Sequence, residues 1–321
     1  MADQDLPPSK LLSEAIPLGV LGALITLENL LVCFLVYRFR NLQTFNNGFV
    51  VSLAVSDILF GGLLIPVNIT DQYNPVNEYL IYFILVENVT SLLAVTFDRF
   101  LAVMYSLSYT YFMTKHFVKI LMAAWIVPVP FCLLPLAWSS GSVVHEVYTF
   151  FIVIGVILPY IFIIFAYIKI YREVERQVKN LAKLKKYENS SESSRKEKRI
   201  ATEARVTKVF AIIAGIFLIS WMPVFYMTIA GALKKEEFIP MELSLVSWYT
   251  MTFGSLANAL VYAFFKADFR NAFLHLFRCK TITNCHQSSS NEAVTRSSVI
   301  VRAWGPFLQS PENFSGPKSN L

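Results

Sequence analysis

Charged residues are scarce in this chain of 321 residues. They make up 16% of the sequence, whereas hydrophobic residues make up 55% and the mean hydropathy is +0.51. A soluble domain of comparable length carries about 25% charged residues. The shortage indicates a protein that has lipid rather than water as its main solvent.

Histidine and cysteine are also few, with four of each. The histidines fall in predicted loops or in the tail and show no metal-ligand spacing. No nucleophile motif is present either. These absences count against an enzyme embedded in the membrane, and no cofactor is expected.

None of the four cysteines lies in a predicted outer loop. An extracellular disulfide is therefore not expected, although the outside of a cell would permit one. Cys279 and Cys285 follow an amphipathic stretch, which is typical of S-palmitoylation. A free cytosolic thiol is the other interpretation of each.

Long apolar runs are the main feature of the chain. A helix needs roughly 20 apolar residues to cross a bilayer. A membrane β-barrel would alternate apolar and polar residues, and these runs do not. The sequence predicts an all-α membrane protein, a seven-transmembrane helix bundle, with spans at about 15–37, 48–70, 79–104, 118–138, 147–171, 209–233 and 243–265.

The lysines and arginines give the orientation, because they collect on the cytosolic side. Of 28 basic residues, only Lys10, Lys234 and Lys235 fall on the other side. This predicts an extracellular N-terminus and a cytosolic C-terminus in the plasma membrane. The net charge of +6 then reflects topology and contact with anionic membrane lipid. Nucleic acid is not an expected partner.

The domain plan follows from the spans. Its parts are an extracellular N-terminus at 1–14, a membrane domain at 15–265, a long basic third cytosolic loop at 172–208 within it, an amphipathic eighth helix at 266–278 and a disordered cytosolic tail at 279–321. The first part of the long loop could extend the fifth span as a helix. Its middle, "ENSSESSRKEK", is polar and is also predicted to be disordered. Phenylalanines near helical spacing place the eighth helix along the inner membrane surface.

Ionisable residues inside spans are candidates for function. Asp57, Glu28 and Glu87 lie at comparable depths in the first three spans. Because hard cations prefer oxygen ligands, a sodium ion can be expected among four oxygen-bearing side chains. These are Asp57, Asn88, Ser255 and Asn258. Hydrogen bonds between helices are the alternative use, and an ion transporter or channel along the three carboxylates is the alternative function.

One landmark in each span resembles the rhodopsin-like family of G-protein-coupled receptors. The landmarks are Asn29, "LAVSD" with Asp57, "DRF" at 98–100, Trp125, Pro159 with Tyr167, "SWMP" at 220–223 and "NALVY" at 258–262, followed by "FKADFRNAF". "MYSLSYTYFMTKH" and "NALVYAFFKADFRNAF" look most like the melanocortin and adenosine receptor branch. The resemblance implies a receptor without enzyme activity, activated by an extracellular ligand and coupled to a heterotrimeric G protein.

The resemblance also implies a two-state switch at the inner ends of the spans. Arg99 would pair with Asp98 and with Glu203 in the resting state. Glu203 precedes Pro223 by twenty residues, which is about 30 Å of helix. On activation the sixth span would move outward, and Arg99 would turn to Tyr167, Tyr262 and the G protein. Trp221, Pro223 and Asn258 complete the switch set.

Departures from the family bear on coupling and on the ligand. Ala259 replaces the proline of the span-seven motif and is expected to straighten that span. Thr252 stands where light-sensing members carry the retinal lysine, and Ile81 stands where amine receptors carry an aspartate. The resemblance therefore counts against a photopigment and against an amine pocket.

The outer half of the predicted bundle is aromatic and apolar. The ligand-binding candidates are Glu78, Tyr82, Phe225, Thr228, Trp248 and Tyr249. They suit a peptide, a lipid or a small aromatic molecule, although Trp and Tyr also form belts at membrane interfaces. Serines at 190–194 and 288–298 are candidate sites for a receptor kinase and arrestin, or ordinary linker. The ending "SNL" resembles a PDZ-binding motif.

Overall fold

The computed structural model describes residues 8–70, 75–137, 153–185, 191–233 and 235–278, and within these ranges the ordered elements are helices. The long ones are α1 (Pro8–Arg38), α2 (Phe45–Leu59), α4 (Pro75–Met104), α5 (Tyr109–Ile126), α8 (Leu158–Lys185), α9 (Ser191–Ser220) and α11 (Leu243–Phe265). The shorter ones are η1 (Arg40–Leu42), η2 (Phe60–Leu64), α3 (Ile65–Thr70), α6 (Pro128–Ala137), η3 (Val153–Ile157), α10 (Met222–Ala232), η4 (Glu236–Phe238) and α12 (Ala267–Arg278).

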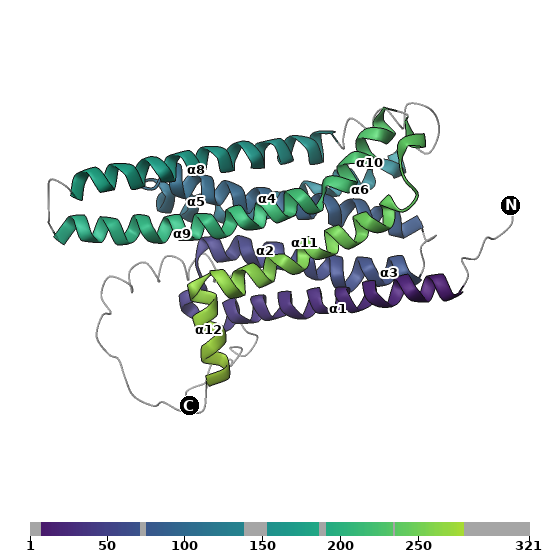
Figure 1. Cartoon of the computed structure of the whole chain (residues 1–321), viewed down its shortest axis with the longest axis horizontal. Coiled ribbons are helices and arrows are strands. Elements are labelled where there is room, and N and C mark those ends of the chain that lie inside the picture. The colour runs from purple at the N-terminus through teal and green to yellow at the C-terminus, as the bar shows by residue number, and fades with distance from the viewer. Residues whose placement is uncertain (1–7, 71–74, 138–152, 186–190, 234, 279–321) are drawn as a thin grey trace, which may run out of the picture.

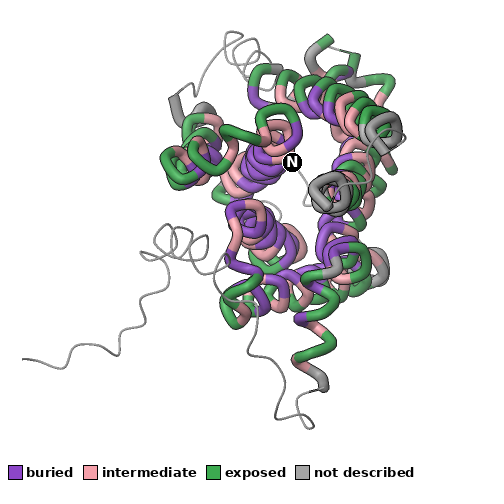
Figure 2. The backbone as a smooth tube through the Cα atoms, turned by 90° about the vertical axis from the view of Figure 1, so that its left-hand side faces the viewer, coloured by how far each residue is buried: buried purple, intermediate pink, exposed green. Residues whose placement is uncertain are grey.

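The long helices form a closed bundle (Figure 1). Going round it, α1 contacts α2, α2 contacts α4, α4 contacts α8, α8 contacts α9, α9 contacts α11, and α11 returns to α1. The helix α4 also contacts α5 and α6, so it is the central element. Seen from the end in Figure 2, buried segments face the middle of the bundle and exposed ones face outward. The outward side chains are largely apolar, as lipid contact requires.

Four described helical stretches are long and apolar enough to cross a membrane by length and composition, and a fifth joins α9 to α10. The four are Glu14–Arg38, Phe45–Thr70, Tyr79–Met104 and Tyr109–Leu133. The axes of α9 and α10 differ by 43° at the break between them. The remaining two predicted spans correspond to η3 with α8 and to α11. The helix α11 runs unbroken through Ala259, as the missing proline predicts.

The long basic segment between the fifth and sixth spans differs in part from expectation. The first part of 172–208 was expected to be able to extend the fifth span as a helix, and α8 continues to Lys185. The middle, 188–198, was expected to be disordered, but α9 already begins at Ser191. Glu, Lys, Arg and Ala dominate 192–205, and these residues are good helix formers. Hydropathy marks only the part of a helix that lies in lipid, which is why the prediction of disorder was wrong for 191–198. The amphipathic eighth helix is confirmed as α12.

The first two spans cross with their backbones in close contact. An added Cβ at Gly22 would lie 2.7 Å from the carbonyl oxygen of Gly61, and one at Gly61 would lie 2.7 Å from that of Gly22. Small residues at such crossings let membrane helices approach closely. At Gly19, three residues earlier, a Cβ would meet only Ile69 Cδ1 at 3.8 Å.

Gly22→Ala and Gly61→Ala are therefore expected to destabilise the bundle by about 1–3 kcal/mol each, because a backbone oxygen cannot move aside cheaply. Gly19→Ala is the matched control and is expected to be neutral or slightly stabilising. Thermal unfolding of the purified chain in detergent measures the difference. Equal melting temperatures for all three variants would contradict the close crossing.

Candidate functional site

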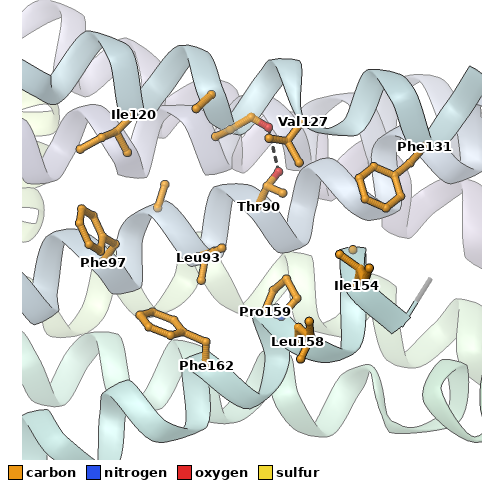
Figure 3. Close-up of a pocket in the computed structure, with 14 residues that line it drawn as sticks. Thr90, Leu93, Phe97, Ile120, Val127, Phe131, Ile154, Leu158, Pro159 and Phe162 are labelled. Carbon is orange, nitrogen blue, oxygen red and sulfur yellow. Dashed lines mark hydrogen bonds between the residues drawn. The ribbon is translucent and has the colours of Figure 1, made fainter. Parts of the chain in front are cut away.

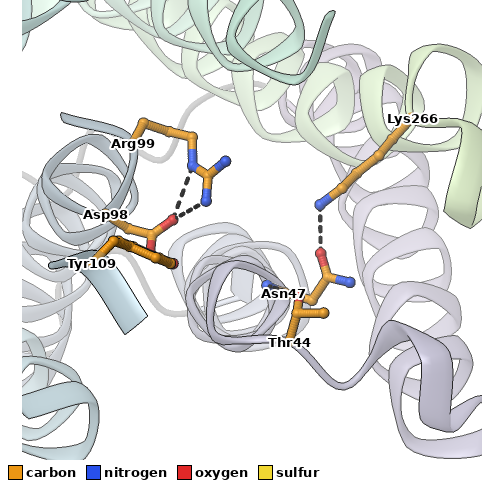
Figure 4. Close-up of polar contacts among 6 residues, drawn as sticks. All are labelled: Thr44, Asn47, Asp98, Arg99, Tyr109 and Lys266. Carbon is orange, nitrogen blue, oxygen red and sulfur yellow. Dashed lines mark hydrogen bonds and ion pairs between the residues drawn. The ribbon is translucent and has the colours of Figure 1, made fainter. Parts of the chain in front are cut away.

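The C-terminal end of α4 carries a compact polar network (Figure 4). The Arg99 guanidinium donates to Oδ2 of Asp98 from Nε, at 2.9 Å, and from a terminal nitrogen. The Tyr109 hydroxyl, from the start of α5, donates to Oδ1 of the same carboxylate at 2.6 Å. Asp98 is fully buried and the Arg99 side chain is 11% exposed. The predicted pairing of Asp98 with Arg99 is present, whereas the contact with Tyr109 was not predicted.

Two cations contact the ring of Phe210 on α9. The guanidinium carbon of Arg99 lies 5.2 Å from the ring centroid, and Nζ of Lys266 lies 5.3 Å from it. Lys266, which links α11 to α12, also lies 5.2 Å from the Phe269 ring and donates to Oδ1 of Asn47 on α2. Cation–π contacts of this kind attract more strongly when they are buried. Phe210 thereby connects α9 to α4, through Arg99, and to the junction of α11 and α12, through Lys266.

Burial, and to a smaller extent the positive charge of Arg99, lower the pKa of Lys266 from 10.5 to about 7. Asp98 and Asp268 act in the opposite direction. Between about pH 7 and 10.5 the folded chain therefore binds fewer protons than the unfolded chain. The free energy of unfolding rises with pH through this window.

The rise is at most about 1.4 kcal/mol per pH unit for one group. Lys266→Met removes this group and is expected to make thermal stability less dependent on pH above 7. Melting temperatures of both forms between pH 7 and 9 measure the two slopes. Parallel slopes would show that Lys266 stays charged in the folded state.

Other predicted switch residues line the core beside this network. Tyr262 is 1% exposed, and its ring centroid lies 5.9 Å from that of Phe210. Tyr167 packs against the same buried cluster from α8. Trp221 precedes α10 at the bend and stacks on Phe217 with ring centroids 5.0 Å apart. The side chain of Glu203 lies outside the described residues, so its predicted contact with Arg99 stays a prediction.

A second polar network lies at the middle depth of the bundle. Asn258 on α11 donates to Oδ2 of Asp57 on α2 at 3.0 Å. On α4, Ser91 donates to Oε1 of Glu87 at 2.5 Å, and its hydroxyl lies 3.1 Å from that of Ser52. Nε1 of Trp125 on α5 donates to the Ser52 hydroxyl at 2.9 Å. The structure thus brings Asp57 and Asn258 together, as predicted, and adds a chain from Glu87 to Trp125.

Three oxygens in this network are buried and have no hydrogen-bond partner among the described residues. They are Oδ1 of Asp57, Oε2 of Glu87 and Oδ1 of Asn258. Unpaired buried oxygens are costly and point to a bound ion or water. Carboxylate and amide oxygens suit a sodium ion. No cluster of three or more His, Cys, Asp or Glu able to hold a metal occurs in the described part of the chain.

The predicted sodium set is only partly assembled. Ser255 is buried on α11 with Asn258. Asn88 directs its amide to the Ile84 carbonyl of its own helix, with a distance of 3.4 Å. Glu28 on α1 is not fully buried, and its Oε1 has no partner among the described residues. Two further carboxylate oxygens, Oε2 of the fully buried Glu87 and Oε1 of the less buried Glu28, are therefore unpaired among the described residues.

The outer ligand candidates occupy different environments. Trp248 stacks on Phe60 at 6.2 Å, and Phe225 packs edge-on against Tyr160 at 4.1 Å, so both contribute to packing. The Tyr249 hydroxyl donates to the Glu14 carbonyl oxygen at a distance of 3.5 Å. Tyr82 and Thr228 are half-buried. The side chain of Glu78 lies outside the described residues, as do Cys279 and Cys285.

The structure is thus a bundle of membrane-spanning helices with an acid–arginine pair at the C-terminal end of α4, a bend between α9 and α10, and a buried acid–amide pair. The sequence matches the 7 transmembrane receptor (rhodopsin family) over residues 28–262, and the chain belongs to that family. It is a multi-pass G-protein-coupled receptor. This membership does not favour the ion-transporter alternative.

Curated relatives agree with the family. The octopamine receptor beta-2R of Chilo suppressalis is 26% identical over 83% of this chain and 79% of its own length. The histamine H2 receptor of Homo sapiens is 25% identical over 85% of this chain and 81% of its own length. The octopamine receptor beta-2R of Drosophila melanogaster is 27% identical over 78% and 58%.

Proposed function

We propose that this receptor activates its G protein by an outward movement of α9 at the cytosolic side, with the N-terminus outside the cell. The Asp98–Arg99–Tyr109 network beside Phe210 supports this proposal most directly. It ties the end of α4 to α5 and places the guanidinium against α9. Moving α9 away separates Phe210 from Arg99 and leaves that cation for the G protein.

The ligand is proposed to be a peptide, a lipid or a small aromatic molecule without an essential ammonium group. The named relatives are octopamine and histamine receptors. In amine receptors the family aspartate of span three pairs with the ammonium group. Here that position is Ile81, which is half-buried and apolar. A buried cation without a partner is strongly disfavoured. Octopamine and histamine are therefore expected to produce no signal up to millimolar concentration in a cell assay.

A sodium ion is proposed as an allosteric ligand between Asp57 and Glu87. The unpaired oxygens of these carboxylates and of Asn258 support it. When bound, the ion would neutralise buried negative charge and hold α2, α4 and α11 together. It would thereby favour the resting arrangement.

The central experiment measures ligand-independent coupling in cells. The chain is expressed at the surface with a panel of G-protein dissociation sensors, beside Arg99→Ala and Glu203→Ala. Arg99→Ala is expected to remove at least about 90% of the signal, and Glu203→Ala to raise it. Arg176→Ala is the matched control, since this cytosolic arginine is 70% exposed.

The outcomes separate the parts of the proposal. A signal that survives Arg99→Ala at equal surface expression contradicts the role of the arginine. A signal unchanged by Glu203→Ala removes only the predicted pair with Glu203. Kinase and arrestin recruitment and palmitoylation of Cys279 and Cys285 stay proposals, since these side chains lie outside the described residues.

A further inference from the structure

Lys266 is a buried cation that has no ion-pair partner in the described part of the chain. It is 5% exposed and lies at the junction between α11 and α12. The ion pairs of the described ranges join Asp98 to Arg99, and Glu173 and Glu175 to bases on their own helix, so none of them includes Lys266. A lysine is rarely buried to this extent unless it is paired. Its charge has no role in the movement of α9 proposed above.

The groups in contact with the Lys266 amine are neutral. Its Nζ donates to Oδ1 of Asn47 on α2 (Figure 4). It also lies 5.3 Å from the ring centroid of Phe210 on α9 and 5.2 Å from that of Phe269 on α12. One neutral acceptor and two ring faces replace only part of the hydration that an ammonium group loses on burial. The closed bundle is therefore poorly suited to a charged Lys266.

The helix α9 supplies one of the groups that cover this amine. Phe210 is fully buried, and its ring also lies 5.2 Å from the guanidinium carbon of Arg99. When α9 moves outward, Phe210 leaves both cations and water reaches Lys266. A hydrated lysine keeps its proton up to a pH of about 10.4. The open arrangement therefore holds a proton on Lys266 more firmly than the closed one does.

Charged groups around Lys266 come from α4 and α12. Arg99 on α4 lowers the pKa of Lys266, whereas Asp98 on α4 and Asp268 on α12 raise it. On α11, one turn earlier, the carbonyl of Tyr262 accepts from the Lys266 backbone N–H at 3.2 Å. The contacts from α2 and α9 are made by side chains that do not titrate. Because burial is the largest influence, the pKa of Lys266 in the closed bundle is about 7, and the amine titrates near neutral pH.

We propose that Lys266 binds a regulatory proton from the cytosol, and that this proton favours the open arrangement of α9. A ligand shifts a two-state equilibrium toward the state that binds it more tightly, and a proton obeys the same rule. Acidification of the cytosol is thus expected to raise basal activity. The proton site rests on the orientation and the outward movement proposed above, and Lys266 is a positioning residue that acts through Phe210.

The distance between α5 and α9 tests the proton site without a G protein. Spin-labelled non-canonical residues replace the exposed Lys115 on α5 and Arg205 on α9 of the full chain in nanodiscs. The helix α5 is a fixed reference because the Thr90 hydroxyl on α4 donates to the Ala124 carbonyl at 2.9 Å (Figure 3). The open population is expected to fall roughly tenfold from about pH 7 to about pH 8.5, and to change less than about twofold from about pH 6 to about pH 7.

Substitutions separate a proton site from a lysine that only supports the fold. Lys266→Met removes the buried charge, so its open population should be no higher than that of the wild type at about pH 8.5 and should not vary with pH. Lys266→Arg stays charged, so its open population should match the wild type at about pH 6 and be equally constant. Asp268→Asn removes an exposed carboxylate that favours the charged amine, so the bend in the pH profile should move to lower pH. Glu175→Gln is the matched control, an exposed carboxylate on α8 that pairs with Lys179, and should leave the bend in place.

The outcomes distinguish the proton site from the movement on which it depends. A pH profile that is the same in Lys266→Met as in the wild type overturns the proton site, as does an open population that grows with pH. Asp98→Asn is the positive control for the movement, measured at a single pH. If α9 moves in Asp98→Asn but not with pH in the wild type, the proton site is wrong and the movement stands. If α9 moves in none of these forms, the outward movement itself is contradicted, and the proton site with it.

Discussion

Asp98→Asn is expected to raise ligand-independent signalling by about tenfold. The Asp98 carboxylate accepts from Arg99 at Nε and at a terminal nitrogen, and also from the Tyr109 hydroxyl. An amide keeps the shape but loses the charge, and a hydrogen bond to a charged group contributes about 1.5–3 kcal/mol. A shift of about 1.4 kcal/mol toward the active state changes its population tenfold while that state is rare. Nucleotide exchange per surface receptor, without ligand, measures the effect.

Tyr109→Phe is the graded comparison for this prediction. It removes one hydrogen bond to Oδ1 of Asp98 and leaves both contacts with Arg99 in place. A smaller rise, of about two- to fivefold, is therefore expected. If Asp98→Asn signals at or below the wild-type level with normal surface expression, then the carboxylate does not restrain Arg99. If Tyr109→Phe equals Asp98→Asn, the tyrosine carries the restraint instead.

The positions of the spans and of Arg99 were readable from the sequence because each depends on nearby residues. An apolar run and an adjacent acid–base pair are local features. Tyr109 was not found, because a tyrosine at the start of a helix carries no signal that it will meet Asp98. Lys266 meets Asn47 across 219 positions of the chain, and only the packed bundle brings them together.

The rotation of each helix about its own axis is a second feature that could not be predicted from the sequence. Adjacent residues on a helix point about 100° apart. Glu87 and Asn88 lie at the same depth, so hydropathy cannot tell which one faces Asp57. In the structure Glu87 joins the chain of Ser91, Ser52 and Trp125, while the Asn88 amide turns back to Ile84. The sequence also gave no indication of the Gly22–Gly61 crossing, since both glycines lie in ordinary apolar runs.

Asp57→Asn is expected to abolish a sodium dependence of basal activity. In the wild type, replacing potassium by sodium at a constant ionic strength of about 0.15 M should lower basal exchange several-fold, because an ion bound between α2 and α4 favours the resting state. The variant keeps a hydrogen-bonding side chain opposite Asn258 but loses the charge that attracts the ion. Its exchange rate should be the same in both salts.

Glu87→Gln and Asn88→Ala then distinguish the sodium ligands expected from the sequence, which include Asn88, from the proposed site between Asp57 and Glu87. Because Glu87 Oε2 is buried and unpaired, Glu87→Gln is expected to weaken the sodium response. The Asn88 amide donates to the Ile84 carbonyl of its own helix, so Asn88→Ala is expected to leave the sodium response unchanged. A response lost in Asn88→Ala but kept in Glu87→Gln would favour the set expected from the sequence. If the wild type has the same basal exchange rate in sodium and in potassium, the sodium ion is ruled out. The unpaired oxygens would then be satisfied by buried water, and the choice of salt would not affect the resting state.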